Sequence, residues 1–235
     1  MVRQKKILNL RETNNQQCTK NCNTEDRKSD TEKGICKITS SVFDKLPVRC
    51  VGGWAFDKIA FIVKYFCIFA TGMRNKWQGL NYIEICSGPG RCIKRENGIE
   101  FDGTALAIVN QDSFDFIRKA VYVDNEQVAV DCLNERLTAL GKSLIAKAYI
   151  GDYNDKESLK KLVIGLPQNC LNLLFVDPTD CSVPFDTLAY LVNYLKNVDL
   201  IVNVSIGLDV KRNIKKAVDA PADKDQEARN KYKRF

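Results

Sequence analysis

Residues 82–92 read Tyr-Ile-Glu-Ile-Cys-Ser-Gly-Pro-Gly-Arg-Cys, an apolar run with one acidic residue that breaks into a turn containing two glycines. Segments with helical spacing of apolar residues separate this run from four later ones, at 120–124, 146–150, 171–177 and 198–204. Near-continuous apolar strands that alternate with helices are typical of a parallel sheet covered on both faces. The sequence therefore predicts an α/β fold, Rossmann-like and doubly wound, with a mainly parallel sheet.

The helices of this fold follow from the same periodicity. A helix is expected before the first strand, because apolar residues recur at helical spacing after Gly52-Gly53. A polar excursion with a turn at Asn97-Gly98 is expected at 91–103. The expected helices are 54–70, 104–118, 126–140, 156–164 and 185–196.

Carboxylates stand at four successive strand ends, where a doubly wound sheet binds its ligands. They are Glu84, Asp124, Asp152 and Asp177, and Asn203 follows the fifth strand. The carboxyl ends of parallel strands meet at one edge of the sheet, so these side chains are expected to line one site. Their regular placement indicates a pocket more strongly than any single motif does.

The glycine turn narrows the class of ligand. A P-loop requires Gly-Lys-Ser/Thr, whereas Arg91-Cys92 follow Gly90, so a nucleoside triphosphatase is not expected. A dinucleotide turn requires a third glycine where Ile93 stands and an acidic residue about twenty positions further on. A dinucleotide oxidoreductase fits poorly and stays a third alternative.

An adenosyl-sulfonium cofactor fits this turn better, because it has no pyrophosphate and carries a positive charge that carboxylates attract. The glycines allow close backbone approach, Asp124 can accept both ribose hydroxyls, and Asp152 can accept from the adenine amino group. A purely structural turn is the competing explanation. The residues expected to bind S-adenosylmethionine are Glu84, Ser87, Gly88, Gly90, Asp124 and Asp152.

Asp177-Pro178-Thr179-Asp180 ends the fourth strand, where a methyl acceptor is expected. A carboxylate and a proline-fixed carbonyl can hold the N–H groups of an amine, so Asp177 and Pro178 are the expected catalytic residues, acting mainly by positioning. The fragment resembles the Asp-Pro-Pro-Tyr signature of enzymes that methylate amino groups of nucleic acids. The second proline and the aromatic residue of that signature are absent, and a simple polar turn is the alternative.

Length and charge limit the class of protein further. A chain of 235 residues with 45% hydrophobic content suits one sizeable core. The apolar stretch 59–70 contains Lys64 and is too short to cross a bilayer, and no apolar core of a signal peptide follows the basic N-terminus. A cytoplasmic protein without a membrane span is therefore expected.

The net charge of +7 is concentrated at the two ends of the chain. Residues 1–50 carry eleven basic and six acidic side chains, and residues 211–235 carry nine and four. These ends could contact nucleic acid, although solvated termini are the simpler explanation. The expected organisation is a polar arm at 1–50, an α/β domain at 51–210 and a basic tail at 211–235.

Four of the ten cysteines lie in the polar arm, at Cys18, Cys22, Cys36 and Cys50. Four thiolates can form a tetrahedral zinc site, but only the first pair has spacing close to that of metal ligands. Structural zinc and four unpaired thiols both remain open. Most other cysteines lie in apolar runs and are expected to be buried.

The order of motifs resembles the three-Cys-motif partner family, bacterial proteins with a fold like that of class I S-adenosylmethionine-dependent methyltransferases. The resemblance covers roughly 47–213. It is carried by Gly53-Trp54, Lys58, Tyr65, Asn75-Lys-Trp77, residues 82–91, Asp102-Gly-Thr-Ala-Leu106, Tyr122-Val-Asp124, Gly151-Asp152, Phe175-Val-Asp-Pro178, Asn203 and Asp209-x-x-Arg212-Asn213.

The resemblance implies that the turn with Glu84 binds the cofactor, that Asp124 contacts its ribose and that Asp177-Pro178 forms the active-site loop. It also implies a partner protein with a three-cysteine motif. The chain departs from the family pattern at Glu84, where Asp is usual, at Cys86-Ser87, where Phe-Ala is usual, and at 103–106. Glu84 keeps the charge, so cofactor binding is expected to survive these changes.

Two functions are therefore compared. The first is an S-adenosylmethionine-dependent methyltransferase with an unknown acceptor, nucleic acid being favoured. The second is a non-catalytic module that binds S-adenosylmethionine or a nucleotide and recruits a protein or nucleic acid. The altered Asp-Pro-Thr-Asp fragment favours the second, as does a count of five expected strands where such methyltransferases usually have seven. A fragment of a longer protein or a sheet truncated at its C-terminal edge would explain that count.

Overall fold

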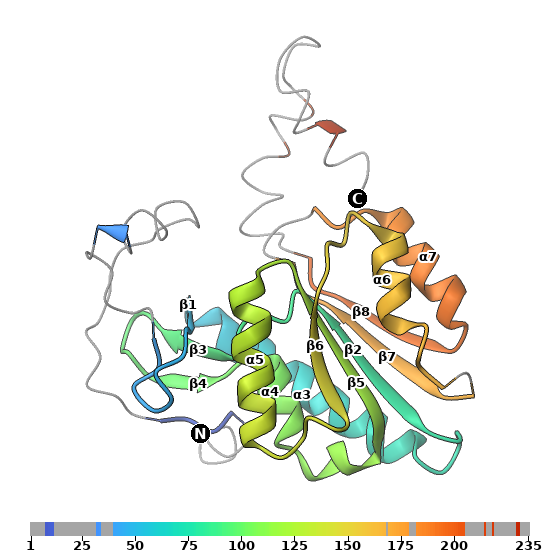
Figure 1. Cartoon of the computed structure of the whole chain (residues 1–235), viewed down its shortest axis with the longest axis horizontal. Coiled ribbons are helices and arrows are strands. Elements are labelled where there is room, and N and C mark those ends of the chain that lie inside the picture. Colours follow the sequence, from blue (N-terminus) through green and yellow to red (C-terminus); the bar gives the residue numbers. More distant parts are fainter. Residues whose placement is uncertain are drawn as a thin grey trace.

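The computed structural model describes residues 8–11, 32–33, 40–167, 169–178, 182–204, 214, 218 and 229–230. Helices and strands alternate along most of this part of the chain (Figure 1). In chain order they are β1 Arg49–Val51, α3 Trp54–Met73, β2 Leu80–Ile85, β3 Arg91–Lys94, β4 Glu100–Asp102, α4 Thr104–Val109, a 3₁₀ helix Asp112–Phe116, β5 Ile117–Asp124, α5 Gln127–Ala139, β6 Ala146–Ile150, α6 Lys156–Val163, β7 Leu171–Val176, α7 Phe185–Leu195 and β8 Val198–Val202.

Five of these strands form one parallel sheet in the order β6-β5-β2-β7-β8. The chain starts at the central strand β2, moves outward through β5 to β6, and then returns to β7 and β8 on the other side. The order in which the strands are added therefore reverses between β2 and β7. This reversal is the topological switch point where doubly wound sheets bind their ligands. This strand order confirms the predicted fold class.

Helices cover both faces of the sheet (Figure 1), and the period of two along each strand decides which side chains meet which helix. Tyr82 of β2, Tyr122 of β5 and Phe175 of β7 face α3, α4 and α5 in one buried cluster. Their neighbours along the strands face α6 and α7 in a second cluster. The predicted strands and helices of this domain all appear, with most ends displaced by a few residues.

A second, three-stranded sheet occupies the region expected to be a polar excursion. Strands β3 and β4 form an antiparallel hairpin, and β1 pairs in parallel with β3. The hairpin buries the charged residues Arg91, Glu100 and Asp102, and the Arg91 guanidinium lies 3.0 Å from the Glu100 carboxylate. Because these charges neutralise one another inside the fold, their polarity gave no sign of a strand.

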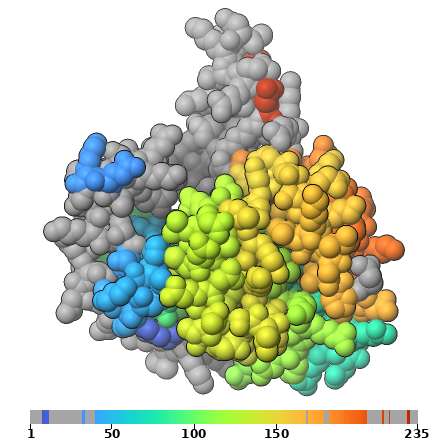
Figure 2. Space-filling model, in the orientation of Figure 1, coloured from blue at the N-terminus to red at the C-terminus, as the bar shows by residue number. Residues whose placement is uncertain are grey.

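The residues just before β1 also contact the domain, although the sequence predicts an irregular arm there. The buried Ser41 donates a hydrogen bond of 2.6 Å from its Oγ to Glu100. Figure 2 shows this part of the chain, in light blue, packed against α5, in yellow-green. Polar contacts hold this segment against the domain, and its sequence has no apolar periodicity. The sequence therefore predicts a loop.

The helix expected at 104–118 is shorter than predicted. Helix α4 ends at Val109, a 3₁₀ turn follows, and Ile117 already begins β5. The side chain of Asn110 donates to Asp102 at 2.8 Å, so it bonds to the β3–β4 hairpin just after the end of the helix. Asparagine and aspartate favour such local stops, because their side chains compete with the backbone for hydrogen bonds.

Candidate functional site at the carboxyl edge of the sheet

Three of the predicted acidic residues lie on the face of the sheet that α3 covers. Glu84 pairs in register with Tyr122 and Phe175, and Asp124 follows Tyr122 by two positions. Asp177 follows Phe175 by the same interval, so the period of two places all three side chains on one face. The parallel register thus brings Glu84, Asp124 and Asp177 together at one edge, as the sequence predicts.

The turn after β2 has an unusual backbone. Cys86, Gly88 and Gly90 have φ of 68°, 63° and 89°, the left-handed region that favours glycine. The backbone N–H groups of Cys86 and Ser87 both donate to the carbonyl of Val123. The turn is therefore fixed to the end of β5, with a non-glycine residue in one strained position.

The two predicted glycines, Gly88 and Gly90, have different structural roles. A Cβ at Gly88 would meet one neighbouring atom within 4 Å, Nε of Arg49 at 3.8 Å. A Cβ at Gly90 would lie 2.9 Å from Leu133 of α5 and 3.1 Å from Leu106 of α4. Gly90 therefore allows the helices to pack under the turn, whereas Gly88 leaves space that a ligand can enter.

Asp124 and Ser87 complete the turn. Asp124 accepts hydrogen bonds from the Gly88 N–H at 2.7 Å and the Glu126 N–H at 3.1 Å, which holds the turn against β5. Each of its oxygens keeps a second lone pair for a ligand hydroxyl. The Oγ of Ser87 is buried and has no hydrogen-bond partner in the structure. Buried hydroxyls are normally paired, so this atom is available to a ligand.

Glu84 is almost completely buried, with 1% of its surface exposed. Burial raises the pKa of its carboxyl group well above the usual value, and the charges of Asp177 and Asp124 act in the same direction. A hydrogen bond of 2.9 Å from the Tyr82 hydroxyl and the charge of Lys58 oppose this rise in the pKa. The Glu84 carboxyl group therefore favours its proton, and a cation beside it would favour the charged form.

Asp177 is engaged by two residues that the sequence does not pair with it, Lys58 and Asn203. The ammonium group of Lys58 in α3 contacts both Asp177 oxygens, at 2.7 and 2.5 Å. The side-chain amide of Asn203, just after β8, donates to Oδ1 at 2.8 Å. Lys58 is 119 residues away from Asp177, so sequence spacing alone gives no sign of the pair. Pro178, the second residue expected to be catalytic, is buried directly after Asp177.

Asp152 follows β6 at the same edge, but the structure does not join it to the other carboxylates. Its side chain is exposed, and Oδ1 accepts hydrogen bonds from the backbone and side-chain nitrogens of Asn154, at 2.8 and 2.9 Å. These contacts form a local turn before α6. The contact with an adenine amino group stays a prediction.

Arg136 of α5 supports the turn from below. Its buried guanidinium donates to the carbonyl of Pro89 at 2.5 Å and to that of Pro47 at 2.9 Å. It also donates to both oxygens of Asp44, each at 2.9 Å. One side chain thus connects the glycine turn, α5 and the segment before β1.

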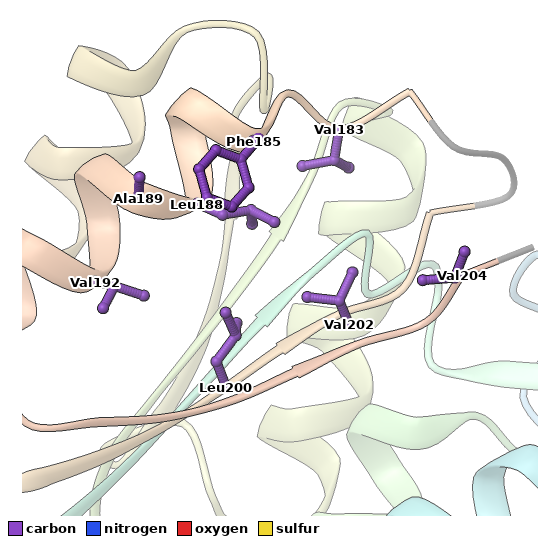
Figure 3. A pocket seen from close by; sticks show the side chains of 8 residues that line it. All are labelled: Val183, Phe185, Leu188, Ala189, Val192, Leu200, Val202 and Val204. Carbon is purple, nitrogen blue, oxygen red and sulfur yellow. The ribbon is translucent and has the colours of Figure 1, made fainter. Parts of the chain in front are cut away.

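A separate groove of about 400 Å³ lies between α7 and β8. Figure 3 shows apolar side chains from both elements pointing into it. It opens on the face of β8 opposite Asn203, so it is not part of the carboxylate cluster. The groove is lined by Val183, Phe185, Leu188, Ala189, Val192, Leu200, Val202 and Val204.

Metal binding and membrane insertion find no support in the described residues. Among these residues, no group of three or more histidine, cysteine or acidic side chains could hold a metal ion. Cys50 is buried beside Ile93, whereas Cys18, Cys22 and Cys36 lie outside the described residues, so the zinc site stays a prediction. Within the described part of the chain, none of the helices is both long and apolar enough to span a bilayer.

Comparisons with known proteins concern the fold alone. The chain matches no family model and no curated protein. An S-adenosylmethionine-dependent methyltransferase from Clostridium acetobutylicum is 12% identical with a TM-score of 0.35, and the match covers 63% of this chain and 57% of that one. The rRNA methyltransferase AviRa from Streptomyces viridochromogenes is 13% identical with a TM-score of 0.37, over 75% and 85%. Likenesses this weak add nothing to what the strand order establishes.

Proposed function

We propose that this protein binds S-adenosylmethionine and transfers its methyl group to a nucleic acid. The observation that carries the proposal is the turn after β2, where the open Gly88 is fixed to Asp124 beside the unpaired hydroxyl of Ser87. The backbone of such a turn can approach a ligand closely, and the turn offers a hydroxyl and carboxylate lone pairs. These groups fit a ribose and an amino-acid moiety.

The carboxylates of the site would attract the positively charged sulfonium of the cofactor. Glu84 lies in the fields of Asp177 and Asp124, with Lys58 as the opposing charge. A sulfonium cation would stabilise the charged form of Glu84 and offset the repulsion between the acids. When bound, the cofactor supplies an electrophilic methyl group, and the protein supplies position and electrostatic stabilisation.

Membership of the three-Cys-motif partner family, with a partner protein that carries that motif, belongs to the same proposal. It is supported by the order of motifs along 47–213 and by the positions of Glu84, Asp124 and Asp177 at one edge of the sheet. The nucleic-acid acceptor is supported by the basic ends of the chain.

A non-catalytic binding module is the second candidate, and one contact favours it. Lys58 and Asn203 already occupy the Asp177 carboxylate, which was expected to hold an amine acceptor. A site that binds cofactor without turnover would show this arrangement. Transfer of labelled methyl groups to any nucleic acid or protein would exclude it.

Isothermal titration calorimetry with S-adenosylmethionine tests the cofactor, and Gly141 offers a matched control for Gly88. The two glycines have φ of 63° and 66°, and no atom crowds a Cβ at either position. Alanine should therefore cost each variant about the same stability, roughly 1–2 kcal/mol. Only Gly88→Ala should weaken cofactor binding, by about tenfold or more, which corresponds to about 1.4 kcal/mol. Absence of binding by the unaltered protein, or equal affinity in both variants, would contradict the proposal. A parallel titration with NAD tests the dinucleotide alternative.

A further inference from the structure

The contacts of Asp177 restrict the chemistry of the group that can be methylated. Its carboxylate receives two contacts from Lys58 and one from Asn203, so three donors already point at it. An incoming amino group would have to displace the ammonium to reach the carboxylate. The side chains of Lys58 and Asp177 are 20% and 14% exposed, so an acceptor can reach them.

Lys58 rather than Asp177 is therefore the group that an acceptor meets. An ammonium has three N–H donors and no lone pair. Two of the three contact Asp177, which leaves one for a ligand. This donor suits an atom that accepts a hydrogen bond and keeps another lone pair for the methyl carbon. A hydroxyl oxygen meets both needs, whereas an amine needs its only lone pair for the reaction.

We propose that Lys58 is a catalytic residue and that the acceptor is a ribose 2′-hydroxyl of RNA. This inference rests on the proposed function, methyl transfer to nucleic acid. Along a nucleic-acid chain the free hydroxyl is the 2′-OH, which RNA has and DNA lacks. Asp177 and Asn203 then act as positioning residues that hold the ammonium in place.

The indole of Trp54 supports a nucleotide acceptor at this position. Trp54 opens α3 and is 51% exposed, and the Lys58 ammonium lies 5.1 Å from its ring centroid. A Cβ at Gly52 would lie 3.1 Å from the indole, so the missing side chain lets the ring lie against the backbone. Exposed aromatic rings beside cationic groups are common stacking surfaces for single-stranded RNA.

The transfer step balances without any further reactant. The acceptor oxygen forms its bond to the methyl carbon as the carbon–sulfur bond breaks and sulfur keeps the electron pair. The hydroxyl proton passes to solvent water. Lys58 stays protonated, donates to the oxygen throughout and stabilises the negative charge that develops as the proton departs.

The test uses the full chain, S-adenosylmethionine labelled in its methyl group, and total RNA or DNA from a heterologous bacterium. A 2′-O-methyl group blocks alkaline cleavage at its own position, so label on a ribose appears in alkali-resistant dinucleotides. Label on a base appears in mononucleotides. The expected result is label in RNA, in the alkali-resistant fraction.

The role of Lys58 is tested with Lys58→Met, Lys58→Arg and the control Lys64→Met, which alters an exposed lysine on the same helix. Lys58→Met should lower the turnover number about 100-fold, the usual effect of losing one donor to a developing oxyanion. Lys58→Arg should recover part of that loss, and Lys64→Met should match the unaltered chain. Cofactor affinity measured by calorimetry should not fall in any of the variants, because Lys58 opposes the carboxylates that attract the sulfonium. A merely structural role of Lys58 would instead predict a fall in cofactor affinity together with the turnover number.

Each other result overturns the inference. Label in RNA mononucleotides places the methyl group on a base, and label in DNA excludes the 2′-hydroxyl. Full activity of Lys58→Met removes the lysine from the reaction. Cofactor binding with no label in RNA refutes the RNA acceptor and leaves the cofactor proposal intact. Absence of cofactor binding refutes the proposed function itself.

Discussion

Replacement of Arg136 by methionine should destabilise the protein more than any loss of a surface ion pair. The Arg136 side chain is 4% exposed, and its guanidinium makes five hydrogen bonds, two to Asp44 and one each to the carbonyls of Leu46, Pro47 and Pro89. Methionine has a similar apolar stem but no donor. The variant therefore removes one donor group from a carboxylate and three carbonyls. The Leu46 carbonyl keeps the Ser41 N–H, and Asp44 keeps the Leu46 N–H.

The expected loss follows from the exposure of each partner. Breaking a fully buried ion pair costs about 3–5 kcal/mol, but the Asp44 side chain is 30% exposed and recovers part of its hydration. We therefore take about 3 kcal/mol for the whole set. For a domain of this size, about 1 kcal/mol corresponds to roughly 2–4 °C, so the melting temperature should fall by about 6–12 °C.

Urea denaturation and scanning calorimetry measure the loss of stability in Arg136→Met and compare it with that of two control variants. Lys142→Met breaks an ion pair of 3.1 Å to Asp115, which is 72% exposed, and should cost less than about 1 kcal/mol. Asp44→Asn removes one charge but keeps the Arg136 contact to Pro89, so its cofactor affinity should be unchanged. Cofactor affinity should fall in Arg136→Met, which loses that contact. The reasoning is refuted if Arg136→Met and Lys142→Met lose the same stability.

Two further predictions concern β2 and the turn that follows it. Cys86→Gly should be more stable than Cys86→Ala by about 1 kcal/mol in urea denaturation, because φ of 68° strains any residue with a Cβ; a more stable alanine variant would show that the strain is absent. Glu84→Gln should gain stability relative to the unaltered chain as the pH rises above 4.5, because the raised pKa of Glu84 makes its contribution fully present below that pH and lost above it. Unfolding at pH 4, 6 and 8 measures this difference, and a difference independent of pH would argue against a protonated Glu84.

The main sheet could be predicted from sequence because its strands are apolar on both sides. Runs such as 171–176 show no alternation, and helical periodicity separates them, which together indicate buried parallel strands. The β3–β4 hairpin could not be predicted in the same way. Arg91 and Glu100 are buried as partners, and their charges resemble those of an exposed loop until the pairing is known.

The residues of the site also divide into those that could be predicted from the sequence and those that could not. Glu84 and Asp124 stand at the ends of strands, so the period of two and the parallel register suffice to place them. Lys58 and Arg136 act through contacts to residues 119 and 47 positions away, and Lys58 lies in a helix whose pattern shows only which face is buried. Local spacing can indicate which carboxylates meet, but not which cations reach them.

The charged side chains at this edge form two groups that differ in how far basic residues neutralise the acidic ones. On the side of the turn that faces α5 and the β3–β4 hairpin, Arg91 and Arg136 are buried against Asp44, Glu100 and Asp102, and Arg136 also donates to the Pro89 carbonyl of the turn. Burial alone would raise the pKa of Asp44, but hydrogen bonds from Arg136 and the Leu46 N–H, with the charges of Arg136 and Arg91, lower it to about 2. Asp44 is therefore ionised at neutral pH. Its ion pair with Arg136 helps to hold the fold in place.

In the second group the balance differs. Glu84 lies among the carboxylates of Asp124 and Asp177 with Lys58 as the opposing cation, and its raised pKa shows that this group favours one more positive charge. In the free protein a proton can supply that charge. A ligand cation bound against the turn would take the place of the proton, so cofactor binding should release protons from Glu84. Calorimetry of S-adenosylmethionine binding in buffers with different ionisation enthalpies would detect this release as a binding enthalpy that depends on the buffer, and the dependence should vanish in Glu84→Gln.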